Sequence, residues 1–202
     1  MNTLRASRRL QQGFTLLEVL VSLVILVFGL LGLIGMQAYT QVATFESYQR
    51  GQALILVQDM ADRINANRRA ALCYNFTTNV AGGAPFAGSG AGSAPVCGPY
   101  GTVDTRVRAD ADMTEWHATL NGAAEQLGGN QVGAMIGARG CVSLDTSVTP
   151  NLYRVSVAWQ GTSKTKDPAT VDGTLTCGKG NYGDEAQRRI VAITFPMACL
   201  NC

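Results

Sequence analysis

The chain has 202 residues, 47% of them hydrophobic, and a formal net charge of +2. This length suits one domain plus an anchoring segment. Three of the 16 basic side chains lie in the first 13 residues, and removing them leaves 13 basic against 14 acidic side chains, a net charge of about −1. Such a balance gives no argument for nucleic-acid binding by bulk electrostatics, so no nucleic-acid partner is predicted.

The N-terminal region combines a basic leader, a glycine and a long apolar run. Arginines supply the only charges before Gly13, and Ser22 is the only polar side chain from Val19 to Met36. The run is long enough to cross a bilayer core, which needs about 20 residues. A secretory signal places its small-residue cleavage site after the apolar run, whereas Gly13 precedes it. The basic leader predicts a cytoplasmic N-terminus and an exported C-terminal region.

Glu18 places a carboxylate within the apolar segment. An ionisable side chain in a membrane helix costs a few kcal/mol or more, and by default it indicates a functional role with a specific partner. The alternative is an ordinary signal anchor in which a glutamate near the edge of the apolar segment has no specific role.

The segment Gly13–Glu18, with the sequence GFTLLE, resembles the prepilin signal of type IV pilins and pseudopilins. The resemblance implies that a prepilin peptidase cuts after Gly13 and that the new N-terminal residue, Phe14, is methylated. It also implies that Glu18, then the fifth residue, pairs with the N-terminal amine of a neighbouring subunit and sets the axial register. Pairing in a low-dielectric environment offsets the cost of desolvating both charges.

A single helix is predicted from about Phe14 to about Ala70, because no proline occurs before Pro85. At 1.5 Å per residue it would be roughly 80 Å long. Beyond Gln37 the pattern becomes amphipathic, and Glu46/Arg50 and Asp59/Arg63 are spaced as i,i+4 ion pairs. The apolar face that should be buried against a domain comprises Ala53, Leu56, Val57, Met60 and Ile64.

Gly29, Gly32 and Gly35 interrupt the first half of this helix. Their spacing could form a close-packing groove for a neighbouring helix. The family resemblance offers local unwinding in an assembled fibre as another role, and ordinary membrane-helix glycines are the third reading.

The segment from Cys73 to Gly101 is predicted to be a loop. Its glycine-rich insertion, Ala81 to Pro95, is expected to bury no core and to be mobile. A disulfide between Cys73 and Cys97 would tie down the ends of the insertion, although the spacing does not prove the pairing.

A short helix is predicted from Ala111 to Leu127, ended by Gly128 and Gly129. His117 lies off its apolar face and is interpreted as a solvated or rim histidine. The apolar face comprises Met113, Trp116, Leu120, Ala124 and Leu127.

Three β-strands should follow. The segment from Gln131 to Leu144 is predicted as a bent or bulged strand, and Leu152 to Trp159 and Arg188 to Phe195 alternate as half-buried strands. The long polar link between the last two contains Cys177, which could reach Cys141 in a meander.

Six cysteines lie on the predicted exported side, where an oxidising compartment favours disulfides. A staple between Cys199 and Cys202 is favoured over a zinc or redox site, since there is only one histidine and one close cysteine pair. No metal, cofactor or catalytic motif is predicted, and the chain is not expected to be an enzyme. The cysteines are Cys73, Cys97, Cys141, Cys177, Cys199 and Cys202.

The helix, loop and strand order also resembles that of PilV-type minor pilins. The implied fold is α+β, the type IV pilin fold, with a long helix packed on a small antiparallel sheet of about 3–4 strands. The segments expected are the leader (1–13), a transmembrane and fibre-core helix (14–39), an amphipathic half-helix (40–72), an αβ-loop region (73–130) and a sheet with a disulfide-rich C-terminal region (131–202).

The implied function is that of a minor pilin, which helps to initiate type IV pilus assembly and enters the fibre used in twitching motility and attachment. Its expected partners are the prepilin peptidase, the major pilin, other minor pilins and the inner-membrane assembly platform. It would lie in the bacterial inner membrane as a single-pass protein with a periplasmic head, and later in the surface pilus. The alternatives are a pseudopilin of a type II secretion system and a pilus-associated adhesin module.

Overall fold

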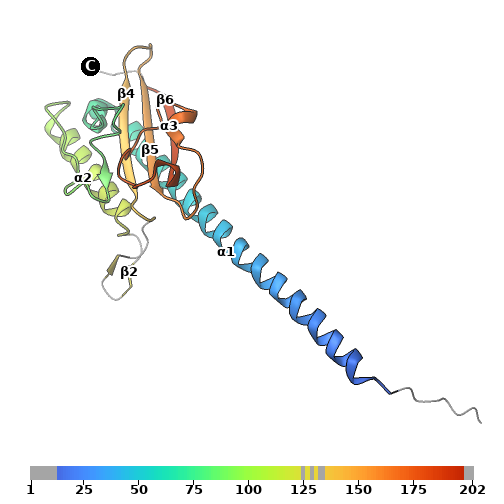
Figure 1. The fold of residues 1–202 in the computed structure, drawn as a ribbon. Coiled ribbons are helices and arrows are strands. Elements are labelled where there is room, and N and C mark those ends of the chain that lie inside the picture. The colour runs from blue at the N-terminus through green and yellow to red at the C-terminus, as the bar shows by residue number, and fades with distance from the viewer. Residues whose placement is uncertain (1–12, 124–125, 128–129, 132–134, 198–202) are drawn as a thin grey trace, which may run out of the picture. The chain divides into compact units, whose positions relative to one another are not determined.

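The computed structural model describes residues 13–123, 126–127, 130–131 and 135–197 (Figure 1). Most of the predicted leader, and both Cys199 and Cys202, lie outside the described residues. The chain divides into two compact units, Met1–Thr44 and Phe45–Cys202. The elements are α1 (Leu16–Ala66), the 3₁₀ helix η1 (Arg68–Tyr74), β1 (Ala87–Gly88), α2 (Val103–Leu120), β2 (Gln126–Leu127), β3 (Asn130–Gln131), β4 (Arg139–Asp145), β5 (Leu152–Gln160), α3 (Pro168–Val171), the 3₁₀ helix η2 (Glu185–Gln187) and β6 (Arg188–Pro196).

Helix α1 begins and ends close to its predicted bounds. It stops at Ala66, and the chain continues through Asn67 into η1 instead of extending the α-helix to Ala70. In the first unit the side chains of α1 are exposed, whereas in the second unit one face is buried. The predicted apolar face is confirmed, and Gln49 and Ala61 are buried with it.

Helix α2 corrects the predicted short helix at both ends. It begins at Val103, because the Thr102 and Thr105 side chains form a reciprocal capping box. It ends at Leu120, since Gly122 adopts a φ of 92°, which favours glycine. The predicted end near Gly128 is therefore wrong. The buried side chains of α2 are Ala109, Asp112, Met113, Trp116 and Leu120.

The main sheet is antiparallel, with strand order β1-β4-β5-β6. Strands β5 and β6 match their predicted positions, and Val155 of β5 lies opposite Val142 and Ile193. The single strand predicted from Gln131 to Leu144 is wrong. The structure instead has a short β2–β3 pair and a separate β4, with Met135 to Ala138 forming a turn before β4.

The glycine-rich insertion also departs from expectation. Ala87 and Gly88 form the edge strand β1, and Ala87 is fully buried in the core. The Gly88 N–H donates to His117 Nδ1 at 3.1 Å, and the Ser89 N–H donates to the Ala138 carbonyl at 2.8 Å. The expectation that this segment buries no core is wrong, because its small side chains allow close packing on α2 and β4.

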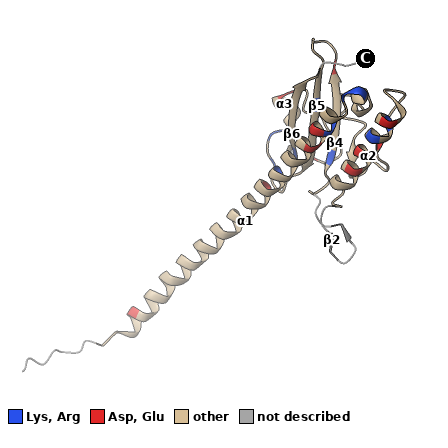
Figure 2. Cartoon of the chain, turned by 180° about the vertical axis from the view of Figure 1, so that it is seen from behind, with Lys and Arg blue, Asp and Glu red and all other residues tan. Residues whose placement is uncertain are grey.

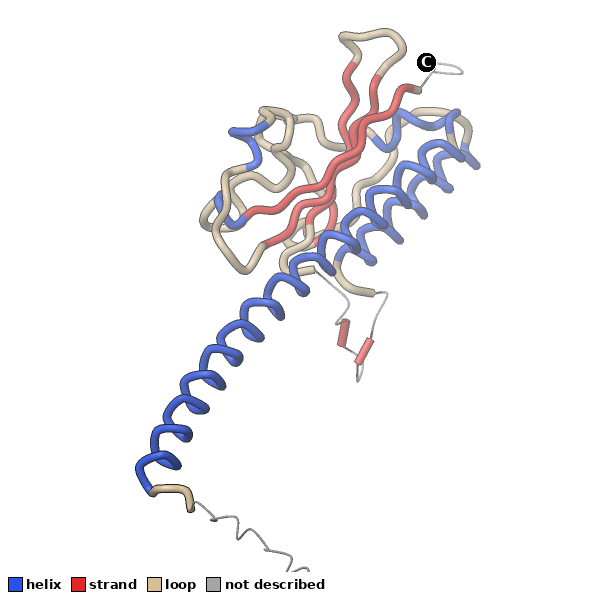
Figure 3. Tube along the Cα trace, turned by 90° about the vertical axis from the view of Figure 1, so that its right-hand side faces the viewer, coloured by secondary structure: helices blue, strands red, loops and turns tan. Residues whose placement is uncertain are grey.

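The second unit has three layers. The second half of α1 and α2 cover one face of the sheet, and the segments around β1 and between β5 and β6 lie over part of the other (Figure 3). Trp116 of α2 links the two helices, because its Nε1 donates to the Leu56 carbonyl of α1 at 2.9 Å. Side chains alternate along β4 and β5, so each strand contributes to a hydrophobic cluster on either face of the sheet. The architecture is an α+β fold.

We predict that Gly140→Ala destabilises this unit by about 1–3 kcal/mol, because overpacking a dense core forces side chains to move. A Cβ at Gly140 would overlap the ring of Trp116. Urea unfolding of the full chain in detergent, followed by tryptophan fluorescence, measures the change. Gly173→Ala is the matched control, since a Cβ there meets nothing within 4 Å. Equal unfolding midpoints for the two variants would contradict the packing described.

Candidate functional site

The N-terminal segment places Glu18 in the first turn of α1. The Glu18 N–H donates to the carbonyl of Thr15 at 3.1 Å and is 3.3 Å from Thr15 Oγ1, so Thr15 starts the helix. A carboxylate in a first helical turn also interacts favourably with the helix dipole. Within the described part of the chain no ion pair engages Glu18, so its carboxylate is free for a partner supplied from outside.

The first half of α1 presents an almost uninterrupted apolar surface. In Figure 2 it carries one acidic position near its start and is otherwise uncharged up to the second unit. The hydroxyl of Ser22 donates to the Val19 carbonyl at 2.8 Å, so this polar group is satisfied inside the helix. By length and composition α1 can cross a membrane, and the relevant stretch buries none of its side chains in the protein.

The three glycines of this half do not break the helix. Helix α1 is continuous through Gly29, Gly32 and Gly35, and a Cβ added at any of them would meet nothing within 4 Å. They leave three open positions on the helix surface. The choice between a packing groove and local unwinding stays a prediction about the assembled state.

The comparison with protein families matched residues 8–34 to the prokaryotic N-terminal methylation motif. The match spans the glycine, the phenylalanine and the glutamate of the predicted prepilin signal. The motif indicates a type IV pilin-like or pseudopilin-like protein. It implies processing by a prepilin peptidase and, together with the apolar helix, a single-pass membrane anchor. Comparison with curated proteins found no match, and comparison with solved structures found none.

Two disulfides fasten loops of the head, the second unit from Phe45 onward. Cys73 is joined to Cys97 and Cys141 to Cys177, with Cα–Cα distances of 4.5 and 5.7 Å. The sequence suggested both pairings, the first because the two cysteines bracket the insertion and the second because a meander would bring them together. The first closes the glycine-rich insertion, and the second fixes the β5–β6 link to the sheet. The proposed staple of Cys199 and Cys202 falls outside the described residues.

A buried polar network joins η1 to α1 and α2. The carboxylate of Asp112, on the buried face of α2, accepts from Tyr74 Oη at 2.6 Å and from Arg63 Nη1 at 3.3 Å. Burial, with the hydrogen bond to Asp112, raises the pKa of Tyr74 well above its ordinary value. Arg63 also bridges Asp59 and Glu115, so the predicted Asp59/Arg63 pair is confirmed within a larger network.

Glu46 is where the predicted ion pairing fails. It does not pair with Arg50, because its Oε1 accepts from the hydroxyl of Thr162 at 2.7 Å and that of Ser163 at 3.1 Å. The guanidinium of Arg189 lies 3.4 Å from the same oxygen. The hydrogen bond from Thr162, then those from Ser163 and the charge of Arg189, lower the pKa of Glu46 to about 2. This contact ties α1 to the start of the β5–β6 link.

A fully buried arginine organises the rest of that link. Arg188 donates from Nε to Glu185 at 2.6 Å and from Nη2 to Asp167 at 3.1 Å. Its Nη1 donates to the Leu175 carbonyl at 2.8 Å. A buried guanidinium is tolerated because carboxylates and carbonyls occupy its donors. The long polar link between β5 and β6 is thereby folded around the positive charge of Arg188.

His117 is half-buried beside the insertion, which agrees with the rim position among the two that were expected. Its Nδ1 accepts from the Gly88 N–H, and burial lowers the pKa of its imidazole. It thus supports β1. Among the described residues no three His, Cys, Asp or Glu side chains cluster as a metal site would require. The expected absence of a metal or cofactor stays a prediction.

Sequence reasoning missed several of these residues for different reasons. Asp112 precedes Trp116 by four positions, so helical periodicity could have placed it on the buried face. No local pattern marks Glu46, since the hydroxyl of Thr162 lies 116 residues away along the chain. Arg188 has one near partner, Glu185, but its burial also depends on Asp167, 21 residues away.

We predict that Glu46→Gln lowers the free energy of unfolding by about 1 kcal/mol at pH 7. A carboxyl whose folded pKa is depressed stabilises the fold above its unfolded pKa, so the difference should shrink as pH falls from 4.5 towards about 2. Urea unfolding across this range is the measurement. Arg50→Gln, which removes the partner predicted from sequence, should leave stability unchanged. A larger effect for Arg50→Gln would contradict the observed contacts.

We also predict that Gly13→Val blocks leader removal. Valine would replace the glycine at the expected cleavage site with a larger, β-branched residue, so we expect the chain to keep its first 13 residues and to lack a methylated Phe14. Intact-mass spectrometry of the membrane-extracted chain reads both changes. Gly51→Ala, at an open helical position, should be processed normally. Detection of methylated Phe14 at the N-terminus of Gly13→Val would show that processing does not need a small residue at position 13. Normal removal of the leader at another residue would show that the cleavage site is assigned wrongly.

Proposed function

We propose that this chain is a minor pilin that helps to initiate type IV pilus assembly and is incorporated into the fibre. The observation that carries the proposal is the methylation motif on an exposed, uninterrupted apolar helix, with one glutamate near its start that forms no ion pair among the described residues. Membrane lipid can cover such a surface first, and the helices of neighbouring subunits can cover it after assembly.

The charge on Glu18 supports incorporation below other subunits. Cleavage after Gly13 creates an amine at Phe14, and an amine of one subunit can neutralise the carboxylate of the next. In a low-dielectric fibre core, that attraction offsets the desolvation of both groups only when they meet in one register. The pair would therefore fix the axial position of each subunit.

The features of the head support a periplasmic location before assembly. Two disulfides join its loops, and disulfides persist in oxidising compartments. The basic leader agrees with a cytoplasmic N-terminus. We propose the major pilin and other minor pilins as partners of the head and helix, with the inner-membrane assembly platform acting on the anchored subunit. The proposed role is mechanical, in pilus biogenesis, and includes no catalytic step.

A pseudopilin of a type II secretion system is the second candidate, because the same methylation motif serves both classes. It would assemble in the periplasm instead of appearing in surface fibres. Mass spectrometry of sheared surface pili separates the two. A peptide that starts at methylated Phe14 and is present in the sheared fraction supports the minor pilin, and its restriction to membranes supports the pseudopilin.

We predict that Glu18→Gln is processed normally but is depleted from sheared fibres by roughly tenfold or more, since losing one partner of a desolvated ion pair costs a few kcal/mol. Quantitative mass spectrometry of fibre and membrane fractions measures the ratio. Ser22→Ala is the control, because that hydroxyl bonds only within its own helix. Unchanged incorporation of Glu18→Gln would remove the register role and favour a subunit placed only at the tip.

A further inference from the structure

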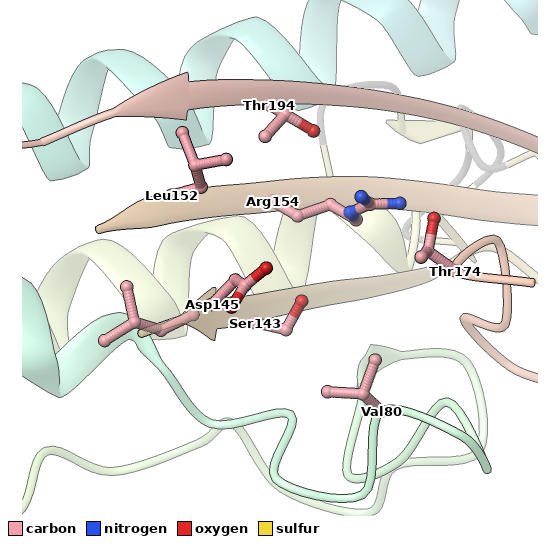
Figure 4. Close-up of a pocket in the computed structure, with 8 residues that line it drawn as sticks. Val80, Ser143, Asp145, Leu152, Arg154, Thr174 and Thr194 are labelled. Atoms are coloured by element: carbon pink, nitrogen blue, oxygen red, sulfur yellow. The ribbon is translucent and has the colours of Figure 1, made fainter. Parts of the chain in front are cut away.

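The outer face of the sheet carries a row of polar side chains across three strands. Ser143 of β4 lies opposite Arg154 of β5, which lies opposite Thr194 of β6. Neighbouring positions on this face are covered by the loops around Cys177 and Phe86, but the row itself lines a pocket of about 220 Å³ (Figure 4). The pocket is completed by Val80, Leu144, Asp145, Leu152 and Thr174.

The walls of this pocket are fixed by the fold. The Thr176 hydroxyl bonds to the Val80 carbonyl, and the Gly178 N–H donates to the Gly83 carbonyl at 3.1 Å. These contacts join the two loops that flank the row. The Cys141–Cys177 disulfide then holds the second loop on the sheet. The pocket is therefore a preformed feature of the head.

Arg154 provides the main recognition group. Its side chain is only 25% exposed, yet no hydrogen bond engages its guanidinium within the described part of the chain. The nearest carboxylate is that of Asp172, with 3.9 Å between Nη1 and Oδ2. Figure 4 shows the guanidinium lying along β5 between Ser143 and Thr194, with Thr174 beside it. An arginine in this state has paired donors available for a planar carboxylate.

Two carboxylates near Arg154 decide what kind of anion fits. Asp145 Oδ1 accepts from Ser147, and Asp172 Oδ1 accepts from Thr174. These hydrogen bonds lower the pKa of each aspartate, so both stay charged. In each case Oδ2 accepts no hydrogen bond from the described residues. One positive group beside two negative groups disfavours a dianion such as phosphate, and it suits a ligand with one carboxylate and several hydroxyl donors.

We propose that this pocket binds an acidic sugar unit, a hexuronate-like ring of a glycan. The carboxylate of the ring would meet Arg154, and its hydroxyls would donate to Asp145, which lines the pocket, and to Asp172, which lies beside Arg154 outside the pocket lining. Val80 and Leu152 offer apolar surface for the C–H face of the ring. The pocket volume is below the range for drug-sized ligands, which agrees with a single ring. The acidic side chain of a protein would bring no donors, and both aspartates would repel it.

The test uses the full chain in micelles of a detergent without a sugar head group. Ligand-observed saturation-transfer NMR is recorded with glucuronate, with glucose as the neutral ring, and with N-acetylglutamate as its α-amide, so that the protein-like ligand carries a single side-chain carboxylate. We expect saturable glucuronate binding that is roughly tenfold tighter than that of either comparison ligand. Equal binding of glucose, or equal binding of N-acetylglutamate, would overturn the proposal; the latter would mark a protein-binding site instead.

Variants then locate the site. Arg154→Gln should weaken glucuronate binding about tenfold or more, whereas Arg68→Gln, exposed on η1, should not. Asp145→Asn should weaken glucuronate binding but leave N-acetylglutamate binding unchanged or tighter, because it removes one negative charge. Thr194→Val, at an exposed position, should reduce glucuronate binding even if Arg154→Gln fails to fold. Undiminished binding in the folded variants would overturn the assignment. The inference stands independently of the pilus-assembly proposal.

Discussion

The structure depends on one helix that must satisfy two different environments. The first half of α1 exposes its apolar side chains on all sides, and within the second half only one face is buried. In water the first half would be strongly unfavourable, so it requires lipid or other apolar helices around it. The second half needs only one stripe of apolar side chains, because the sheet and α2 cover only one side of it. A single continuous element thereby links an anchor to a folded head.

The head is held to that stripe by packing and by polar contacts that cross between elements. Trp116 lies between the two helices and the sheet, and its indole is satisfied by the Leu56 carbonyl. Asp112 and Arg63 add a buried charged network, which requires the two helices to keep one relative position. Glu46 ties a third segment to α1 through Thr162 and Ser163.

The other face of the sheet has a different character. Disulfide-anchored loops cover part of it, and the buried charge of Arg188 stabilises the fold of the longer loop. Because the covering loops stop short of the row at Arg154, a polar pocket remains at their edge. The same arrangement thus divides the molecule into an apolar helix suited to assembly and an outward face suited to recognition. The inferred glycan site belongs to that second face, where its occupancy need not disturb helix packing.

The sequence by itself determined the elements whose signals are local. Gly13, Phe14, Glu18 and the apolar run follow one another along the chain, and the motif match over residues 8–34 covers the three residues and most of the run. Periodicity likewise predicted the buried face of α1 and the positions of β5 and β6, since each depends on side chains a few residues apart.

Only the tertiary structure decided features that depend on distant partners. Close packing on α2 and β4 turned part of a glycine-rich loop into an edge strand. The bounds of α2, by contrast, follow from local signals that the sequence analysis missed, a capping box and a glycine with positive φ. Glu46 contacts partners more than 100 residues away instead of Arg50, its i,i+4 neighbour, because hydroxyls and a guanidinium converge on it in the folded head. The pocket at Arg154 has the same origin. Strand register aligns three polar residues that no spacing along the chain connects.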